Sequence, residues 1–195
     1  IILASQSAIR RSLLENAGIP CDAIPARVDE DAVKSALLAE GAPPRDIADK
    51  LAELKGLRVS ARNGETLVLS ADQVLVSGGT LYNKARDADE LAVQLRELRG
   101  KSHELLSAAV ICEGGRPVWR HVGRAQLIMR SFSDTYLEEY IADGGAGLLD
   151  TVGGYKLEEK GAQLFSRVQG DYFSVLGLPL LEILGFLRAR GILTE

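Results

Sequence analysis

The stretch TLVLSADQVLV, residues 66–76, is a leucine- and valine-rich run that is typical of a buried β-strand. Asp72 interrupts this run, although an ionised carboxylate in apolar surroundings is costly unless it is paired, hydrogen-bonded or bound to metal. Either the run ends early and Asp72 lies in a turn, or the strand continues and the carboxylate serves a metal ion or a reaction. Apolar residues resume at once in Val74–Val76, which favours the second interpretation.

Strand-like and helix-like segments alternate on both sides of this run, which favours an α/β fold with a mixed sheet and helices packed on it. The expected strands are Ile1–Ala4, Leu67–Val76, Leu105–Cys112, Val118–Met129 and Gln163–Val168. The expected helices are Ser7–Ala17, Asp46–Ser60, Ala88–Leu98, Asp134–Ala142 and Leu180–Arg190. No internal repeat or composition shift marks a linker, so we expect residues 1–195 to form a single domain.

The composition, with 46% hydrophobic and 26% charged residues, is that of an ordinary soluble domain. A net charge of −4 argues against a surface adapted to a nucleic-acid polymer or to a membrane. Cys21 and Cys112 lack CxxC spacing, and no apolar run approaches the roughly 20 residues of a membrane span. We therefore expect a cytoplasmic protein, with an initiator methionine or a few further residues preceding Ile1.

The segment LASQSAIRRSLLENAG, residues 3–18, predicts a strand followed by a helix that Ser7 caps and Gly18 ends. Arg10 and Arg11 then lie in or beside the first turn, where the helix dipole already carries partial positive charge. A cation at that end costs a few tenths to about 1 kcal/mol, so we expect an anionic partner there.

Other polar residues are ordinary when each is taken alone. Glu30 belongs to an acidic triplet typical of a solvated surface, Lys55 lies on an expected helix, and Lys84 precedes another helix. Together with Arg10 and Asp72 they form a mixture suited to phosphoryl chemistry, in which cations neutralise phosphate oxygens and carboxylates hold a divalent metal and orient water.

Nucleophilic catalysis has weak support in the sequence. His103 and His121 are the only histidines; neither lies in an HExxH motif, and no GxSxG motif contains Ser5 or Ser7. We expect both histidines to be ordinary strand or loop residues.

The glycine pair Gly153–Gly154 is also a candidate functional feature. Glycines allow close approach of the backbone, and this pair directly precedes the charged segment YKLEEKG.

The polar residues lie in blocks that follow one another along the chain, namely LASQSAIRRSLLENAGI, VDED, LAELKG, SADQVL, NKARDADELAVQLRELRGKSHE, VGGYKLEEKGAQLF and GDYFSVLGLPL. In this order they resemble the Maf proteins, which are nucleoside triphosphate pyrophosphatases. The resemblance implies hydrolysis between the α and β phosphates, with Mg²⁺ or Mn²⁺, to a monophosphate and pyrophosphate. It also implies an elongated mixed β-sheet flanked by helices, two lobes around a central cleft (a Maf/ITPase-like fold), and a possible homodimer.

The resemblance also implies which residues form the phosphate-handling site, and these are Ser5, Ser7, Arg10, Glu30, Lys55, Asp72 and Lys84. The expected catalytic residues among them are Asp72, Arg10, Lys84 and Lys55, and the expected substrate contacts are Ser5 and Ser7. Asp72 corresponds to the general base and would hold the metal together with Glu30.

Three positions, Ile9, Gln73 and Glu158, resemble the branch of the family that acts on 7-methyl-GTP and are expected to bind substrate. Glu158 can accept hydrogen bonds from the guanine N1–H and exocyclic amine, and it complements the positive charge of the methylated ring. The alternatives are a dTTP and UTP pyrophosphatase, or a nucleotide-binding regulator of septum formation.

Overall fold

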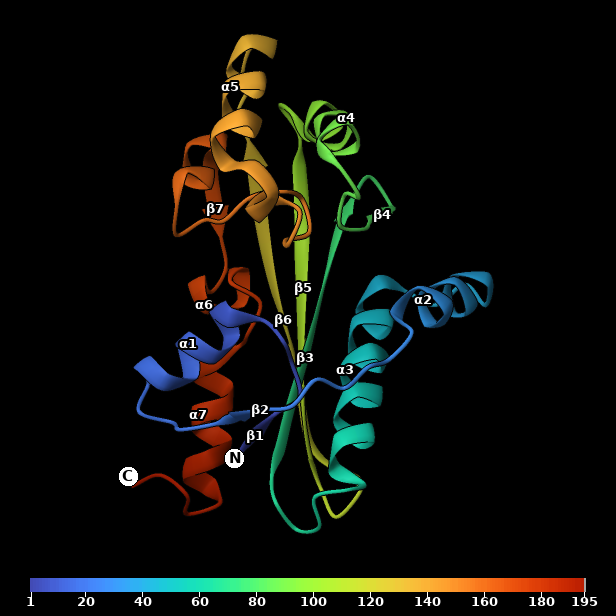
Figure 1. The fold of residues 1–195 in the computed structure, drawn as a ribbon, viewed down its shortest axis with the longest axis vertical. Coiled ribbons are helices and arrows are strands. Elements are labelled where there is room, and N and C mark those ends of the chain that lie inside the picture. Colours follow the sequence, from blue (N-terminus) through green and yellow to red (C-terminus); the bar gives the residue numbers. More distant parts are fainter. Residues whose placement is uncertain (195) are drawn as a thin grey trace. The chain divides into compact units, whose positions relative to one another are not determined.

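The computed structural model describes residues 1–194 and contains a 7-stranded mixed sheet with helices packed against it (Figure 1). The strands are β1 (Ile2–Leu3), β2 (Asp22–Ala23), β3 (Val68–Ser77), β4 (Thr80–Tyr82), β5 (Ser102–Glu113), β6 (Arg116–Met129) and β7 (Phe165–Gln169). The α-helices are α1 (Ala8–Asn16), α2 (Glu30–Ala39), α3 (Pro44–Ser60), α4 (Ala88–Leu98), α5 (Asp134–Gly144), α6 (Tyr172–Val175) and α7 (Leu180–Ala189). The predicted α/β class is confirmed.

The chain divides into two compact units. The first contains Ile1–Gln73, Leu106–Gly123 and the C-terminal segment from Asp171, and the second contains Val74–Leu105 and Arg124–Gly170. Strands β3, β5 and β6 contribute residues to both units. The expectations of a single domain and of a cleft between two lobes stay predictions.

Alternate residues of β3 face opposite helical layers in the first unit, because successive side chains of a strand point to opposite faces of the sheet. Leu69 and Ala71 pack in a core cluster with residues of α1 and α7. Ser70, on the other face, donates from Oγ to the carbonyl oxygen of Ala52 in α3 at 2.7 Å. Figure 1 shows α1 and α7 on one side of β3 and α3 on the other, so both faces of the predicted buried strand are covered here.

Strand β1 is the point at which the chain reverses its direction across the sheet. It pairs in parallel with β2 on one side and with β3 on the other. Helix α1 connects β1 to β2, whereas α2 and α3 connect β2 to β3. In open α/β sheets this arrangement leaves a crevice outside the carboxyl ends of the strands, where ligands bind. The residues that follow β1 therefore occupy a favoured ligand position.

Several short elements are absent from the sequence predictions. Strands β2 and β4 have two and three residues, which is too short for a recognisable alternation. Helix α2 has no buried residue, so the apolar spacing that reveals the longer helices is weak. Residues Lys160–Leu164 form a 3₁₀-helix, and β7 starts after it, at Phe165. None of the helices in the described part of the chain is long and apolar enough to cross a membrane.

The packing of α3 on the sheet predicts an unusual response to a helix substitution. A Cβ atom on Gly56 would lie 2.7 Å from Ser70 Oγ and 2.8 Å from Cys112 Sγ. Replacing glycine by alanine within a helix normally stabilises by about 1 kcal/mol, but overpacking of a core costs about 1–3 kcal/mol. We expect Gly56→Ala to lower the free energy of unfolding measured in urea.

The matched control is Gly185→Ala in α7, where no atom lies within 4 Å of the added Cβ. This control should stabilise the protein by up to about 1 kcal/mol. Equal stabilisation by both substitutions would contradict the tight contact between α3 and the sheet.

Candidate functional site

The N-terminus of α1 follows β1 directly and is organised by two serines. Ser7 is the N-cap, as predicted, and its Oγ accepts from the Arg10 backbone N–H at 3.5 Å. The Ser7 backbone N–H donates to Ser5 Oγ at 3.2 Å. The first turn contains no acidic residue, so its partial positive charge is not offset within the helix. Arg11 is exposed and pairs with Glu15 at 2.7 Å on the surface of the same helix.

The Arg10 guanidinium is held by main-chain carbonyl groups. Its Nε donates to the Gly177 carbonyl oxygen at 2.8 Å, and Nη1 donates to the Ala71 carbonyl oxygen at 2.9 Å. Within residues 1–194 nothing accepts a hydrogen bond from Nη2. Burial lowers the pKa of Arg10, and the negative charges of Asp72 and Glu30 partly oppose this shift. The group is thus a pre-oriented cation with donors left for an anionic ligand.

Asp72 lies inside β3, which excludes the alternative of a turn. It is on the same face as Ser70, toward α3, where Lys55 Nζ lies 2.7 Å from Asp72 Oδ1. The same ammonium lies 2.8 Å from Oε1 of Glu30, the first residue of α2. The Asp72 and Lys55 side chains are only 6% and 11% exposed, so this is a buried ion pair. The local sequence alone suggests that Glu30 is an ordinary solvated residue, but the structure makes it the second ion-pair partner of Lys55.

One oxygen of the buried carboxylate lacks a partner. Asp72 Oδ2 makes no hydrogen bond to any described residue. A buried polar atom in this condition costs free energy unless a ligand, ion or water satisfies it. Among the described residues, no group of three or more histidine, cysteine or acidic side chains is arranged so that it could hold a metal ion. A divalent ion would therefore rely on Asp72 and Glu30 together with water and ligand oxygens, a donor set that suits Mg²⁺.

Gln73 follows Asp72 but faces the opposite helical layer. Its Nε2 donates to Ser107 Oγ at 2.9 Å and to the carbonyl oxygens of Ser174 and Val175 at 3.1 and 3.0 Å. Ile9 lies partly exposed in the first turn of α1. The expected contacts of Gln73 and Ile9 with a nucleotide stay predictions.

Lys84 and Glu158 belong to the second unit and are both exposed. Lys84 precedes α4, whose N-cap is Asp87; its Oδ1 accepts from the Glu90 backbone N–H at 2.8 Å. The first unit thus brings together the predicted site residues Ser5, Ser7, Arg10, Glu30, Lys55 and Asp72. The expectation that Lys84 and Glu158 join them stays a prediction.

The segment before Glu158 packs tightly inside the second unit. A Cβ atom on Gly154 would lie 2.0 Å from Leu91 Cδ1, and one on Gly153 would lie 2.6 Å from Leu75 Cδ1. Both glycines have positive φ, at 66° and 80° respectively. Tyr140 OH also donates to the Gly154 carbonyl oxygen at 3.0 Å. The predicted close approach of the backbone at these glycines is confirmed.

Tyr155 anchors the same segment to the sheet. Its OH lies 2.7 Å from Nε2 of His103 in β5, and its ring packs edge-on against Phe165. Burial lowers the pKa of His103 to about 4 and raises that of Tyr155, so both groups are neutral near pH 7. His103 is therefore a buried strand residue that supports the segment carrying Glu158.

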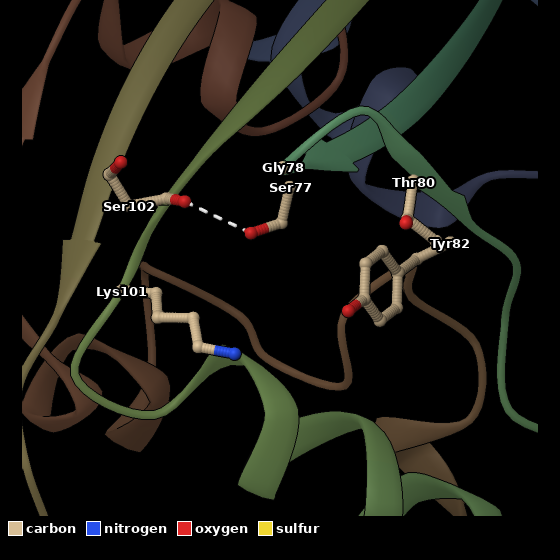
Figure 2. Close-up of a pocket in the computed structure, with 6 residues that line it drawn as sticks. All are labelled: Ser77, Gly78, Thr80, Tyr82, Lys101 and Ser102. Carbon is tan, nitrogen blue, oxygen red and sulfur yellow. Dashed lines mark hydrogen bonds between the residues drawn. The ribbon is translucent and has the colours of Figure 1, made fainter.

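A pocket in the second unit contains none of the predicted site residues (Figure 2). Its lining residues are Ser77, Gly78, Thr80, Tyr82, Lys101 and Ser102. Ser77 Oγ donates to the Ser102 carbonyl oxygen at 3.0 Å, and Tyr82 OH donates to Glu97 at 3.0 Å. Two of its four hydroxyl groups are thus already used by the protein. The pocket is left with Lys101 and the hydroxyl groups of Thr80 and Ser102, and no carboxylate lines it.

The first unit has the character of an α/β protein that binds an anionic ligand at the carboxyl ends of parallel strands. The chain belongs to the Maf family, since the family described as Maf-like protein matches residues 1–190.

Individual relatives agree with this assignment over nearly their full lengths. The chain is 54% identical to a nucleoside triphosphate pyrophosphatase of Roseobacter denitrificans, over 98% of this chain and 96% of that protein. It is 53% identical to a protein of the same name from Ruegeria pomeroyi, over 99% and 97% of the two chains. A 7-methyl-GTP pyrophosphatase of Rhizobium etli is 44% identical, over 98% of this chain and 96% of its own length.

The buried ion pair predicts a large stability effect. Lys55→Met removes the cation but leaves the Asp72 carboxylate buried, and breaking such a pair from one side costs about 3 kcal/mol or more. We expect this loss in the free energy of unfolding measured in urea. The double variant Lys55→Met/Asp72→Asn should recover much of it, because the Asp72 charge is removed together with its partner. Wild-type stability in Lys55→Met would contradict the pairing.

Proposed function

We propose that this protein hydrolyses a nucleoside triphosphate between its α and β phosphates, releasing a nucleoside monophosphate and pyrophosphate. The observation that carries the proposal is the buried Asp72 carboxylate, which Lys55 holds while Oδ2 has no partner among the described residues. The names of the relatives from Roseobacter denitrificans and Ruegeria pomeroyi support the same reaction. A protein that only binds nucleotides has no evident need for such a carboxylate, so an enzyme is favoured over a regulator.

Asp72 acts on the attacking water. Its Oδ2 accepts a proton from this water as the water oxygen bonds to the α phosphorus and the bond to the bridging oxygen breaks. Lys55 Nζ lies 2.7 Å from Oδ1 and so restrains the orientation of the carboxylate. A general base held in one orientation loses little freedom during the reaction, which is the source of its effectiveness.

Arg10 and the start of α1 bind the triphosphate. The guanidinium is oriented by the carbonyl groups of Gly177 and Ala71, so it needs little rearrangement to stabilise negative charge on the leaving pyrophosphate. Ser5, Ser7 and the N-terminal backbone N–H groups of α1 supply neutral donors and a positive dipole end. Lys84 is proposed as a second cation for the same phosphates.

The residues present also fit a divalent metal, and we include Mg²⁺ or Mn²⁺ in the proposal. The Asp72 and Glu30 carboxylates would hold the ion. Each carboxylate oxygen has two lone pairs, so Asp72 Oδ2 could face the ion and the attacking water together. When bound, the ion would neutralise part of the phosphate charge.

The proposed nucleotide is a modified guanosine triphosphate of the 7-methyl-GTP type. Glu158 is exposed, so its carboxylate is accessible to a base, and a carboxylate can accept from both guanine N–H groups. A relative from Rhizobium etli carries the name 7-methyl-GTP pyrophosphatase.

The reaction is tested by incubating the protein with a panel of nucleoside triphosphates and Mg²⁺ or Mn²⁺, while measuring pyrophosphate separately from orthophosphate. We expect pyrophosphate as the direct product and loss of turnover with a chelator. Asp72→Asn should lower kcat by about 10²–10⁴-fold, as removal of a general base does, whereas Asp150→Asn, on an exposed site, should not. Direct release of orthophosphate would contradict the proposal, and tight nucleotide binding without turnover would favour a regulator.

The substrate preference is tested by Glu158→Gln. A hydrogen bond to a charged group is worth about 1.5–3 kcal/mol, so the preference for 7-methyl-GTP over UTP, measured as kcat/KM, should fall by about tenfold or more. The neighbouring exposed residue gives the matched control, Glu159→Gln, which should leave the preference unchanged. An unaltered preference in Glu158→Gln would remove this residue from base recognition.

A further inference from the structure

The side chain of Gln73 is committed to the protein. An amide NH₂ group has two protons, and Gln73 Nε2 lies within 3.1 Å of three acceptors, on Ser107, Ser174 and Val175. Two of these acceptors are the last carbonyl groups of α6, a helix of four residues. Gln73 therefore ties the end of a very short helix to β3.

The end of α6 leads directly to the group that orients Arg10. The Ser174 carbonyl oxygen, which accepts from Gln73, also accepts from the Gly177 backbone N–H at 3.1 Å. Gly177 has φ of +97°, a conformation that L side chains rarely adopt, so its peptide groups are set by this turn. Its own carbonyl oxygen then accepts from Arg10 Nε at 2.8 Å.

A continuous series of hydrogen bonds thus runs from Gln73 through the α6 turn to Arg10. The helix itself is too short to be rigid alone, since a single turn gains little from its own backbone hydrogen bonds. Ser107 adds a second link between Gln73 and α6, because its Oγ accepts from Gln73 and donates to the Ser174 carbonyl oxygen at 2.6 Å.

We propose that Gln73 is a positioning residue, which holds the α6 turn and, through the Gly177 carbonyl group, the orientation of Arg10 toward the phosphates. The inference rests on the proposed function of Arg10 as a phosphate ligand. In this role Gln73 affects only the binding of the triphosphate, through Arg10, and makes no contact with the base.

The test uses Gln73→Met, which keeps the length and neutrality of the side chain but removes its donors. Binding of inorganic tripolyphosphate, measured by calorimetry in metal-free buffer, should weaken about tenfold in this variant. It should not weaken further when the variant is combined with Arg10→Ala, because a residue that acts through Arg10 has no effect without it. Gln126→Met, at a partly buried glutamine of β6 in the other unit, should bind like the wild type.

Kinetics give a second readout. Gln73→Met should lower kcat/KM for UTP and for 7-methyl-GTP by the same factor. A changed nucleotide preference would overturn the inference, because it would mean that Gln73 contacts the base. An equal loss of tripolyphosphate affinity with and without Arg10 would also overturn it, since the effect would then be independent of the guanidinium.

Gly177→Ala provides an independent variant should Gln73→Met fold poorly, as judged by thermal unfolding. The φ of +97° is strained for alanine, so the substitution shifts the backbone whose carbonyl group holds Arg10, and the added Cβ would lie 3.4 Å from Arg10 Nε. Its effect on tripolyphosphate affinity should also vanish in the Arg10→Ala background, and persistence there would count against the inference.

Because tripolyphosphate binding needs no turnover, an inactive wild type would contradict only the proposed hydrolysis. A wild type that does not bind tripolyphosphate would overturn this inference as well.

Discussion

The ion pair between Lys55 and Asp72 is the constraint on which the site of this protein depends. A carboxylate within a buried strand is tolerated only when a partner offsets the loss of its hydration. Lys55 supplies that partner from α3 at 2.7 Å, and it reaches Glu30 in α2 with the same ammonium. The pair thus links a strand and two helices, and it allows β3 to continue without a break past its only charged residue.

The alternation of side chains along β3 separates two tasks. Asp72 faces α3, where charged groups meet, and Gln73 faces the layer of α1, α6 and α7, where an amide meets carbonyl groups. Neighbouring residues of a strand point to opposite faces of the sheet. The proposed catalytic residue, Asp72, and the proposed positioning residue, Gln73, therefore lie on opposite faces although they are adjacent in sequence. Arg10, from α1, is held by carbonyl groups of both β3 and the turn after α6.

Much of this fold follows from local pattern. The buried strand around Asp72, the Ser7 cap and the long helices were predicted, because apolar periodicity and capping chemistry act over a few residues. Helices α2 and α6 were not predicted from the sequence, since α2 has no buried residue and α6 is a single turn. The pairing of Glu30 with Lys55, and the acceptors of Gln73 on α6, are contacts between distant segments that no local pattern reveals. The family resemblance selected the site residues, but the structure supplied their partners.

The use of main-chain carbonyl groups to hold Arg10 also bears on how such sequences can diverge. Every residue type carries a carbonyl oxygen, so the acceptor at Ala71 persists through most substitutions of its side chain. Carbonyl groups also carry no net charge, so they orient the guanidinium without neutralising it, as a carboxylate partner would. Sequence drift can therefore proceed around this arginine, limited by backbone conformation at Gly177, while its full positive charge is preserved.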